Sequence, residues 1–168
     1  MAQREFTDAI ALLKADHREV EELFSQFESA RGRKQEIAER ICNELKVHSM
    51  IEEEIFYPAF RGKIDDDLLD EAYVEHDGAK VLINDIMAGG PEEDFYDAKV
   101  KVLQEQIEHH VEEEEKRSEG MFAQCRETDV DLVALRDQML PRKQELMQQA
   151  ETAGLPPAQP SVVNPQLT

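Results

Sequence analysis

Apolar residues recur at alternating steps of three and four along four long stretches of the chain. This spacing places them on one side of an α-helix and predicts four amphipathic helices. Gly, Pro and Asp residues separate the stretches, and the expected helices cover about residues 6–28, 34–57, 65–89 and 92–117. Long helices joined by short turns are typical of a bundle. The predicted fold class is therefore all-α, an up-down antiparallel four-helix bundle.

Beyond the four helices the chain changes character twice. A fifth helix is expected from about Thr128 to Ala150, packed along the outside of the bundle and kinked at Pro141. From Gly154 onward there are four prolines and almost no core-forming residues, which predicts a disordered tail. The predicted organisation is thus a bundle over residues 1–125, a C-terminal helix packed on it over 126–150, and a disordered tail over 151–168.

The charge of the chain restricts its partners. The formal net charge is −19, whereas nucleic acids and anionic membranes both require a basic face, so neither is an expected partner. No apolar run is long enough to cross a bilayer, and the N-terminus lacks the apolar core of a signal peptide. The expected location is the cytoplasm. Cys42 and Cys125 are too few for a disulfide framework and are expected to be reduced thiols without a catalytic role.

Ionisable residues interrupt the apolar seams of all four helices at their middle. Each seam carries one histidine, and two seams carry a glutamate one turn later. The six residues are His17, His48, Glu52, His76, His110 and Glu114. A buried carboxylate costs several kcal/mol unless something compensates it, and a pair of metal ions in the bundle core removes that cost. The six residues are therefore predicted to be metal ligands.

The order His, then His-x-x-x-Glu, occurs once in each half of the chain. Two metals bridged by two glutamates fit this internal symmetry better than one. Any single histidine on a seam is more often a hydrogen-bonded core residue than a ligand, so the prediction depends on all four together. The seam phase favours His110 over His109, and Glu115 is a possible substitute for Glu114. The neighbouring glutamates at 53, 54, 112 and 113 are expected on a solvated face.

The segments KADHREVEELF, LKVHSMIEEEIFYPAF, EHDGAK and EHHVEEEE resemble the four helices of the hemerythrin-like, or HHE, cation-binding domain. The resemblance covers about residues 5–125. It implies a cofactor of two non-haem iron ions, bridged by two carboxylates and an oxo or hydroxo group. Carried onto this chain, it makes His17, His48, His76 and His110 the terminal imidazole ligands, and Glu52 and Glu114 the bridges.

Lys80 stands one turn after His76, where oxygen-carrying members of the family have a further histidine. Four imidazoles, two carboxylates and one oxygen fill about ten of roughly twelve positions around two six-coordinate ions, so about two stay open. Open positions favour reaction with peroxide or nitric oxide over reversible oxygen carriage. Two interpretations of Lys80 remain. Its ammonium turns away to solvent or a carboxylate, or it stands beside an open position and stabilises a bound anion.

The expected function is that of a non-haem di-iron protein that binds or senses a small ligand, oxygen or nitric oxide. The alternatives are an enzyme that removes hydrogen peroxide or nitric oxide, and an iron-buffering or regulatory module. The expected partner is the small ligand itself: oxygen, nitric oxide or peroxide. The sequence leaves open which protein partner, if any, the chain has, and it does not decide whether the protein is an enzyme.

Overall fold

The structure is a computed structural model that describes residues 5–164. Those residues form helices and no strand, which confirms the all-α prediction. No helix among them is long and apolar enough to span a membrane. The helices are α1 (Ala9–Ser29), α2 (Lys34–Ile51), the π-helix η1 (Glu52–Phe56), α3 (Tyr57–Phe60), α4 (Asp66–Ala88), α5 (Tyr96–Glu115), α6 (Met121–Arg126) and α7 (Leu132–Thr152).

Aspartate side chains fix where three of the helices begin. Asp8 caps α1 by accepting a hydrogen bond of 2.9 Å from the backbone N–H of Ala11, so the helix begins three residues later than expected at Phe6. Asp65 caps α4 and Asp131 caps α7 in the same way. Helix α5 also begins later than the expected residue 92, because residues 91–95 form turns instead.

One helix runs without interruption from Lys34 to Phe60, through α2, η1 and α3. Pro58 was expected to end it but lies inside it. A proline has no N–H and crowds the carbonyl four residues before it. The π-helical turn that precedes Pro58 has a wider hydrogen-bond spacing of five residues. Pro141 likewise lies within α7, which continues across it to Thr152.

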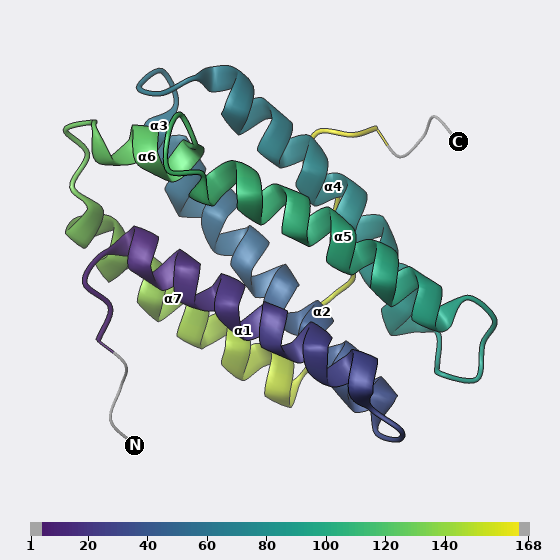
Figure 1. Cartoon of the computed structure of the whole chain (residues 1–168). Coiled ribbons are helices and arrows are strands. Elements are labelled where there is room, and N and C mark those ends of the chain that lie inside the picture. The colour runs from purple at the N-terminus through teal and green to yellow at the C-terminus, as the bar shows by residue number, and fades with distance from the viewer. Residues whose placement is uncertain (1–4, 165–168) are drawn as a thin grey trace.

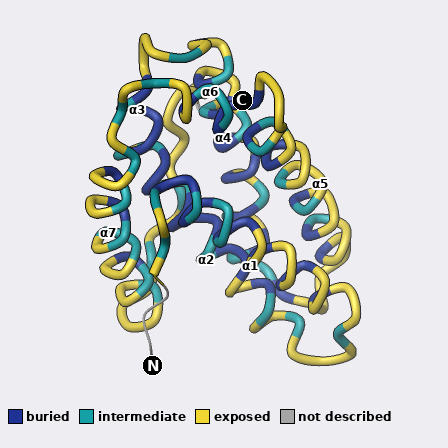
Figure 2. The backbone as a smooth tube through the Cα atoms, turned by 60° about the vertical axis from the view of Figure 1, so that its left-hand side comes forward, coloured by how far each residue is buried: buried dark blue, intermediate teal, exposed yellow. Residues whose placement is uncertain are grey.

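The four long helices alternate in direction and enclose the core (Figure 1). Helix α1 packs against α2 and α5, while α4 packs against α2 and α5. Helix α7 lies outside, against both α1 and α2, as the sequence predicted for the fifth helix. The inward sides of the helices are buried and their outward sides exposed (Figure 2).

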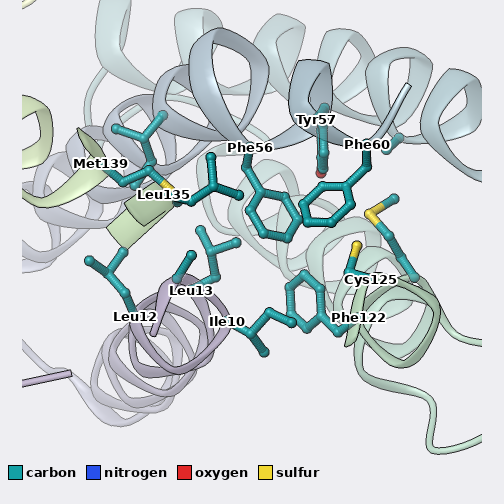
Figure 3. Packing of buried hydrophobic residues seen from close by; sticks show 14 of the residues in the cluster. Ile10, Leu12, Leu13, Phe56, Tyr57, Phe60, Phe122, Cys125, Leu135 and Met139 are labelled. Atoms are coloured by element: carbon teal, nitrogen blue, oxygen red, sulfur yellow. The ribbon is translucent and has the colours of Figure 1, made fainter. Parts of the chain in front are cut away.

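The apolar core consists of two separate clusters. In the first, the Phe56 ring centroid lies 4.9 Å from that of Phe60 and 5.8 Å from that of Phe122 (Figure 3). The second joins α1, α2, α4 and α5 further along the bundle. On α1, Leu13 belongs to the first cluster and Val20 to the second. The predicted ligands lie between the two clusters, which makes them a polar layer across an otherwise apolar core.

The C-terminal segment departs from the sequence prediction. Residues 155–163 were expected to be disordered, but they return to α4 and lie against α2 and α4 (Figure 1). Pro156 O accepts a hydrogen bond of 3.1 Å from Lys46 Nζ, and Ala158 exchanges two hydrogen bonds with the Asn84 side chain. Leu155 packs against the first apolar cluster, and specific polar attachments hold the rest of the segment. The last four residues of the predicted tail lie outside the described residues.

Candidate metal centre

The polar layer brings all six predicted ligands together. They come from four different helices of the bundle, and each is at most 7% exposed. Their potential ligand atoms form two groups in which all atoms lie within 4.8 Å of one another. The first group is His17, His48 and Glu114, and the second is Glu52, His76 and His110.

Each glutamate lies between imidazoles of different groups. Glu52 Oε1 is 3.0 Å from His48 Nε2 and 3.3 Å from His76 Nε2. Glu114 Oε1 is 3.3 Å from the Nε2 atoms of both His17 and His110. Each carboxylate can therefore contact both halves of the layer, which is the placement that a bridging carboxylate requires.

Several of these buried polar atoms have no hydrogen-bond partner among the described residues. They are the Nε2 atoms of His17 and His48, both carboxylate oxygens of Glu52, and Glu114 Oε1. The short distances between these nitrogen and oxygen atoms do not have the angles of hydrogen bonds. Two ligands at about 2.1 Å from one ion and at right angles would lie about 3.0 Å apart. The spacing and the unpaired atoms thus fit a cation held between them.

A closed ring of carboxylates surrounds the imidazoles on their outer sides. Each imidazole directs Nδ1 at a carboxylate on a neighbouring helix. The contacts are His17 with Glu115 at 2.6 Å, His48 with Asp16 at 2.9 Å, His76 with Glu53 at 3.0 Å, and His110 with Glu75 at 2.9 Å. A carboxylate at Nδ1 holds the proton there, orients the ring, and leaves the Nε2 lone pair for a metal.

Each outer carboxylate has in turn a basic side chain beside it. The four pairs are Glu115 with Arg18, Asp16 with Lys143, Glu53 with Lys80, and Glu75 with His109. Arg18, Lys143 and Lys80 carry positive charges that compensate part of the negative charge that the ring adds around the glutamates of the inner layer. The ring was not predicted from the sequence, although its residues stand in symmetric positions along the chain. Asp16 and Glu75 each directly precede a histidine ligand, and Glu53 and Glu115 each directly follow a glutamate ligand.

Tyr57 is a further member of the layer that the sequence analysis missed. Its hydroxyl donates a hydrogen bond of 2.8 Å to Glu114 Oε2 and lies 3.3 Å from Nε2 of both His76 and His110. The π-helical turn explains this position, because the Tyr57 N–H bonds to the Glu52 carbonyl five residues earlier. The extra residue in the turn directs both side chains to the same side of the helix.

The electrostatics of the layer favour cations strongly. Burial alone lowers the pKa of His48, but the charges of Glu52 and Asp16 and the hydrogen bond to Asp16 raise it to about 10. Against the same effect of burial, Glu114, Glu75 and Glu52 raise the pKa of His110 well above its usual value. Burial raises the pKa of Glu114, yet the adjacent imidazoles hold it well below its usual value. In the absence of metal, the site therefore attracts protons to its imidazoles.

The sequence predictions for the residues next to the six ligands have mixed outcomes. His109 is 65% exposed and contacts Glu75, in agreement with the seam phase. Glu115 bonds to the outer side of His17 and does not replace Glu114. Glu53 was expected on a solvated face but is only 11% exposed, because it lies between His76 and Lys80.

The profile of the Hemerythrin HHE cation binding domain family matches residues 8–122. The chain belongs to this family. Among solved structures, this HHE protein is similar to the crystal structure of a hemerythrin HHE cation binding domain-containing protein from Mycobacterium kansasii. The two share 21% sequence identity with a TM-score of 0.73, over 89% of this chain and 96% of the other, which shows a common fold. No curated protein matches the chain.

Family membership gives the polar layer its chemical class, a cation-binding site that for this family is expected to hold iron. The matched region ends at residue 122 and so contains the six inner residues and Tyr57. Helix α7 and the segment after it lie beyond the match. Two of the contacts to the outer carboxylates, from Lys143 and Ser161, come from this part of the chain.

Proposed function

We propose that this HHE protein is a non-haem di-iron protein that binds or senses a small ligand, oxygen or nitric oxide, at a carboxylate-bridged centre. The observation that carries the proposal is the pair of buried ligand groups, each within 4.8 Å, joined by two glutamates whose inner oxygens lack hydrogen-bond partners among the described residues. Iron bound there would supply ligand binding and electron transfer to the small molecule. The residues of the chain hold and orient the ligand set.

A small cavity beside the imidazoles supports a ligand of a few atoms. It has about 30 Å³ of free space, which exceeds the roughly 10–15 Å³ that a single water needs. All four histidine ligands are among the residues that line it. Its other walls are mainly apolar, formed by Val20, Leu45, Ala79, Ile83, Ile107 and Val111, and the polar residues Asp16, Ser49 and Lys80 complete the lining. An apolar cavity of this size favours an uncharged diatomic molecule over a larger or charged substrate.

The position of Lys80 supports binding or sensing over peroxide removal. Its Nζ lies 3.0 Å from Glu53 and 3.1 Å from Asp77, and it donates a hydrogen bond of 3.1 Å to Ser161 Oγ. The ammonium is thus held by two carboxylates, and its charge is largely compensated before any anion reaches the cavity. This agrees with the interpretation in which Lys80 turns to a carboxylate. One observation still supports the enzymatic alternative. Lys80 stands where some relatives have a further histidine, so that coordination position has no imidazole to fill it.

The first test measures the metal. Protein expressed with iron and desalted is expected to retain close to two irons per chain by elemental analysis. His110→Ala should lose most of the iron, whereas the matched variant His109→Ala, in the adjacent exposed position, should retain it. A protein that holds no metal would refute the proposal, and one iron per chain would refute its binuclear part.

The second test separates the functions. The reduced protein is mixed with oxygen, nitric oxide or hydrogen peroxide, and its absorption spectrum is followed with time. Binding or sensing predicts a stable spectral change with oxygen or nitric oxide and slow consumption of peroxide. Lys80→Met should leave the rate with peroxide unchanged. Rapid turnover of peroxide that falls in Lys80→Met would instead establish the enzymatic alternative.

A further inference from the structure

The part of the chain beyond the family match contacts the outer carboxylates at two places. Helix α7 packs against α1 and α2, which brings Lys143 to the carboxylate of Asp16. Residues 155–163 lie against α2 and α4, which brings the hydroxyl of Ser161 to the carboxylate of Glu53. We name this second segment the C-terminal strap. Both carboxylates are held at the outer side of an imidazole of the metal centre.

Asp16 connects α7 to His48 through its two different oxygens. Asp16 Oδ2 accepts the hydrogen bond of 2.9 Å from His48 Nδ1, while Oδ1 pairs with Lys143 Nζ. Asp16 is 4% exposed, so solvent competes little for either oxygen. Because a carboxylate held at both oxygens has a fixed plane, Lys143 restricts the direction in which Asp16 holds the imidazole.

Glu53 connects the strap to His76 in the same manner. Glu53 Oε2 is 3.0 Å from His76 Nδ1, while Oε1 accepts a hydrogen bond from Ser161. The strap is fixed at this point by Asp77, which accepts hydrogen bonds of 2.8 Å from three successive backbone N–H groups, those of residues 161–163. Lys80 also contacts Glu53, so Ser161 is one of two groups that hold this carboxylate.

We propose that α7 and the C-terminal strap are part of the metal centre, with Lys143 and Ser161 as positioning residues for His48 and His76. The proposal rests on the proposed function, since it takes these imidazoles as ligands. The two histidines belong to different ligand groups, and both contact Glu52. The C-terminal part of the chain thus positions one histidine ligand at each of the two metal positions, and both of these histidines lie next to Glu52.

The expected loss of metal affinity is taken from comparable hydrogen-bond partners of histidine ligands in other metal sites. Removing a group that orients a ligating histidine typically weakens metal binding about 10–100-fold. Lys143→Met is expected at the upper end of that range, because Lys143 is the only described partner of Asp16 Oδ1. Ser161→Ala is expected at the lower end, because Lys80 still contacts Glu53.

The experiment uses the full-length protein with 15N-labelled histidine. Ring signals are recorded by NMR in the metal-free protein, and Fe²⁺ affinity is then measured anaerobically against a competing chelator. Lys143→Met should change the ring signals of His48 alone, and Ser161→Ala those of His76 alone. Lys143→Arg and Ser161→Thr keep the donor and should restore both signals and affinity. Arg142→Met, which removes a neighbouring charge that pairs with Glu54, and Gln159→Ala within the strap are the matched controls and should change neither.

Two results would overturn the inference. In one, neither His48 nor His76 responds to its variant and the Fe²⁺ affinity is unchanged. In the other, all four buried histidines respond equally and the melting temperature falls, which would mean that the extension only supports packing. Selective NMR changes in a protein whose wild type binds no iron would uphold the positioning geometry while refuting the proposed function. The two proposals can therefore fail separately.

Discussion

Metal binding to the six-residue layer should release protons, and the structure indicates how many. His48 has a pKa of about 10, and that of His110 is raised well above its usual value, so both imidazoles carry an extra proton at pH 7.5 in the metal-free protein. A metal ligand needs the unprotonated nitrogen, so both protons must leave when the site fills. We therefore expect at least two protons to be released per chain at pH 7.5.

The measurement is isothermal titration calorimetry with Zn²⁺, which accepts the same nitrogen and oxygen ligands as iron. Titrations in buffers of different ionisation enthalpy yield the number of protons released. The logarithm of the overall binding constant for the two ions should also rise with pH above 7.5 toward the His48 pKa of about 10, by about one per pH unit for each imidazole that is still protonated. His109→Gln is the control and should release as many protons as the wild type, because His109 is exposed. Tight binding without proton release would refute the assignment of these imidazoles as ligands.

The same pKa values determine how the metal-free protein responds to pH. The folded pKa of His48 lies above its usual value of 6.5. Its charged form therefore stabilises the fold fully below pH 6.5, and this contribution is lost as pH rises through about 10. The free energy of unfolding should fall by about 1.4 kcal/mol per pH unit for this group across that window. The metal-bound protein should not share this loss, because its imidazoles have already lost their protons.

Three further predictions follow from the inner layer. Glu52→Ala should abolish tight binding of both metals, since Glu52 contacts imidazoles of both groups. Glu53→Ala should weaken metal binding only about 10–100-fold, and equal losses of affinity for the two variants in a chelator competition would contradict this. Tyr57→Phe leaves Glu114 Oε2 without its donor and should cost about 1–3 kcal/mol in urea unfolding of the metal-free protein, and an unchanged stability would mean that the hydrogen bond is absent. Metal at 100 times its Kd should add about 2.7 kcal/mol per site, so equal melting temperatures with and without metal would argue against a buried ligand set.

The inner layer was predictable from sequence because it follows regular helix geometry. The positions of His17, His48, His76 and His110 continue the apolar seams at steps of three and four, so a helix of 3.6 residues per turn places them at the core without further information. The same argument separated His110 from His109, and the structure agrees with it.

Tyr57 was missed for the converse reason. A seam drawn at regular helical steps does not anticipate a π-helical turn, and η1 adds one residue between Glu52 and the next residue on the same side. The sequence does contain a relevant signal. Pro58 lies in a stretch that is apolar at both Phe56 and Phe60, and a helix that continues through a proline must widen or bend near it. A π-helical turn changes which residues face the core, and a pattern of regular helical steps cannot detect it.

The outer ring was missed because composition suggests a different explanation for its residues. In a chain with 38 acidic residues, any one of them is best explained by a solvated surface, and Glu53 and Glu115 stand inside acidic runs. The contacts of these residues come from far away in the chain: Ser161 lies 108 residues from Glu53, His17 lies 98 residues from Glu115, and for Asp16 the partner Lys143 lies 127 residues away. A terminal segment poor in apolar residues was predicted to be disordered for a related reason, since that prediction considers only the apolar surface that a segment can bury. Here the strap is held by hydrogen bonds to Asp77 and Asn84 on α4. The acidic composition that hides the ring from sequence reasoning is thus the source of its chemistry, because each carboxylate of the ring orients an imidazole, and Asp16 and Glu53 also fix a more distant part of the chain, α7 and the strap.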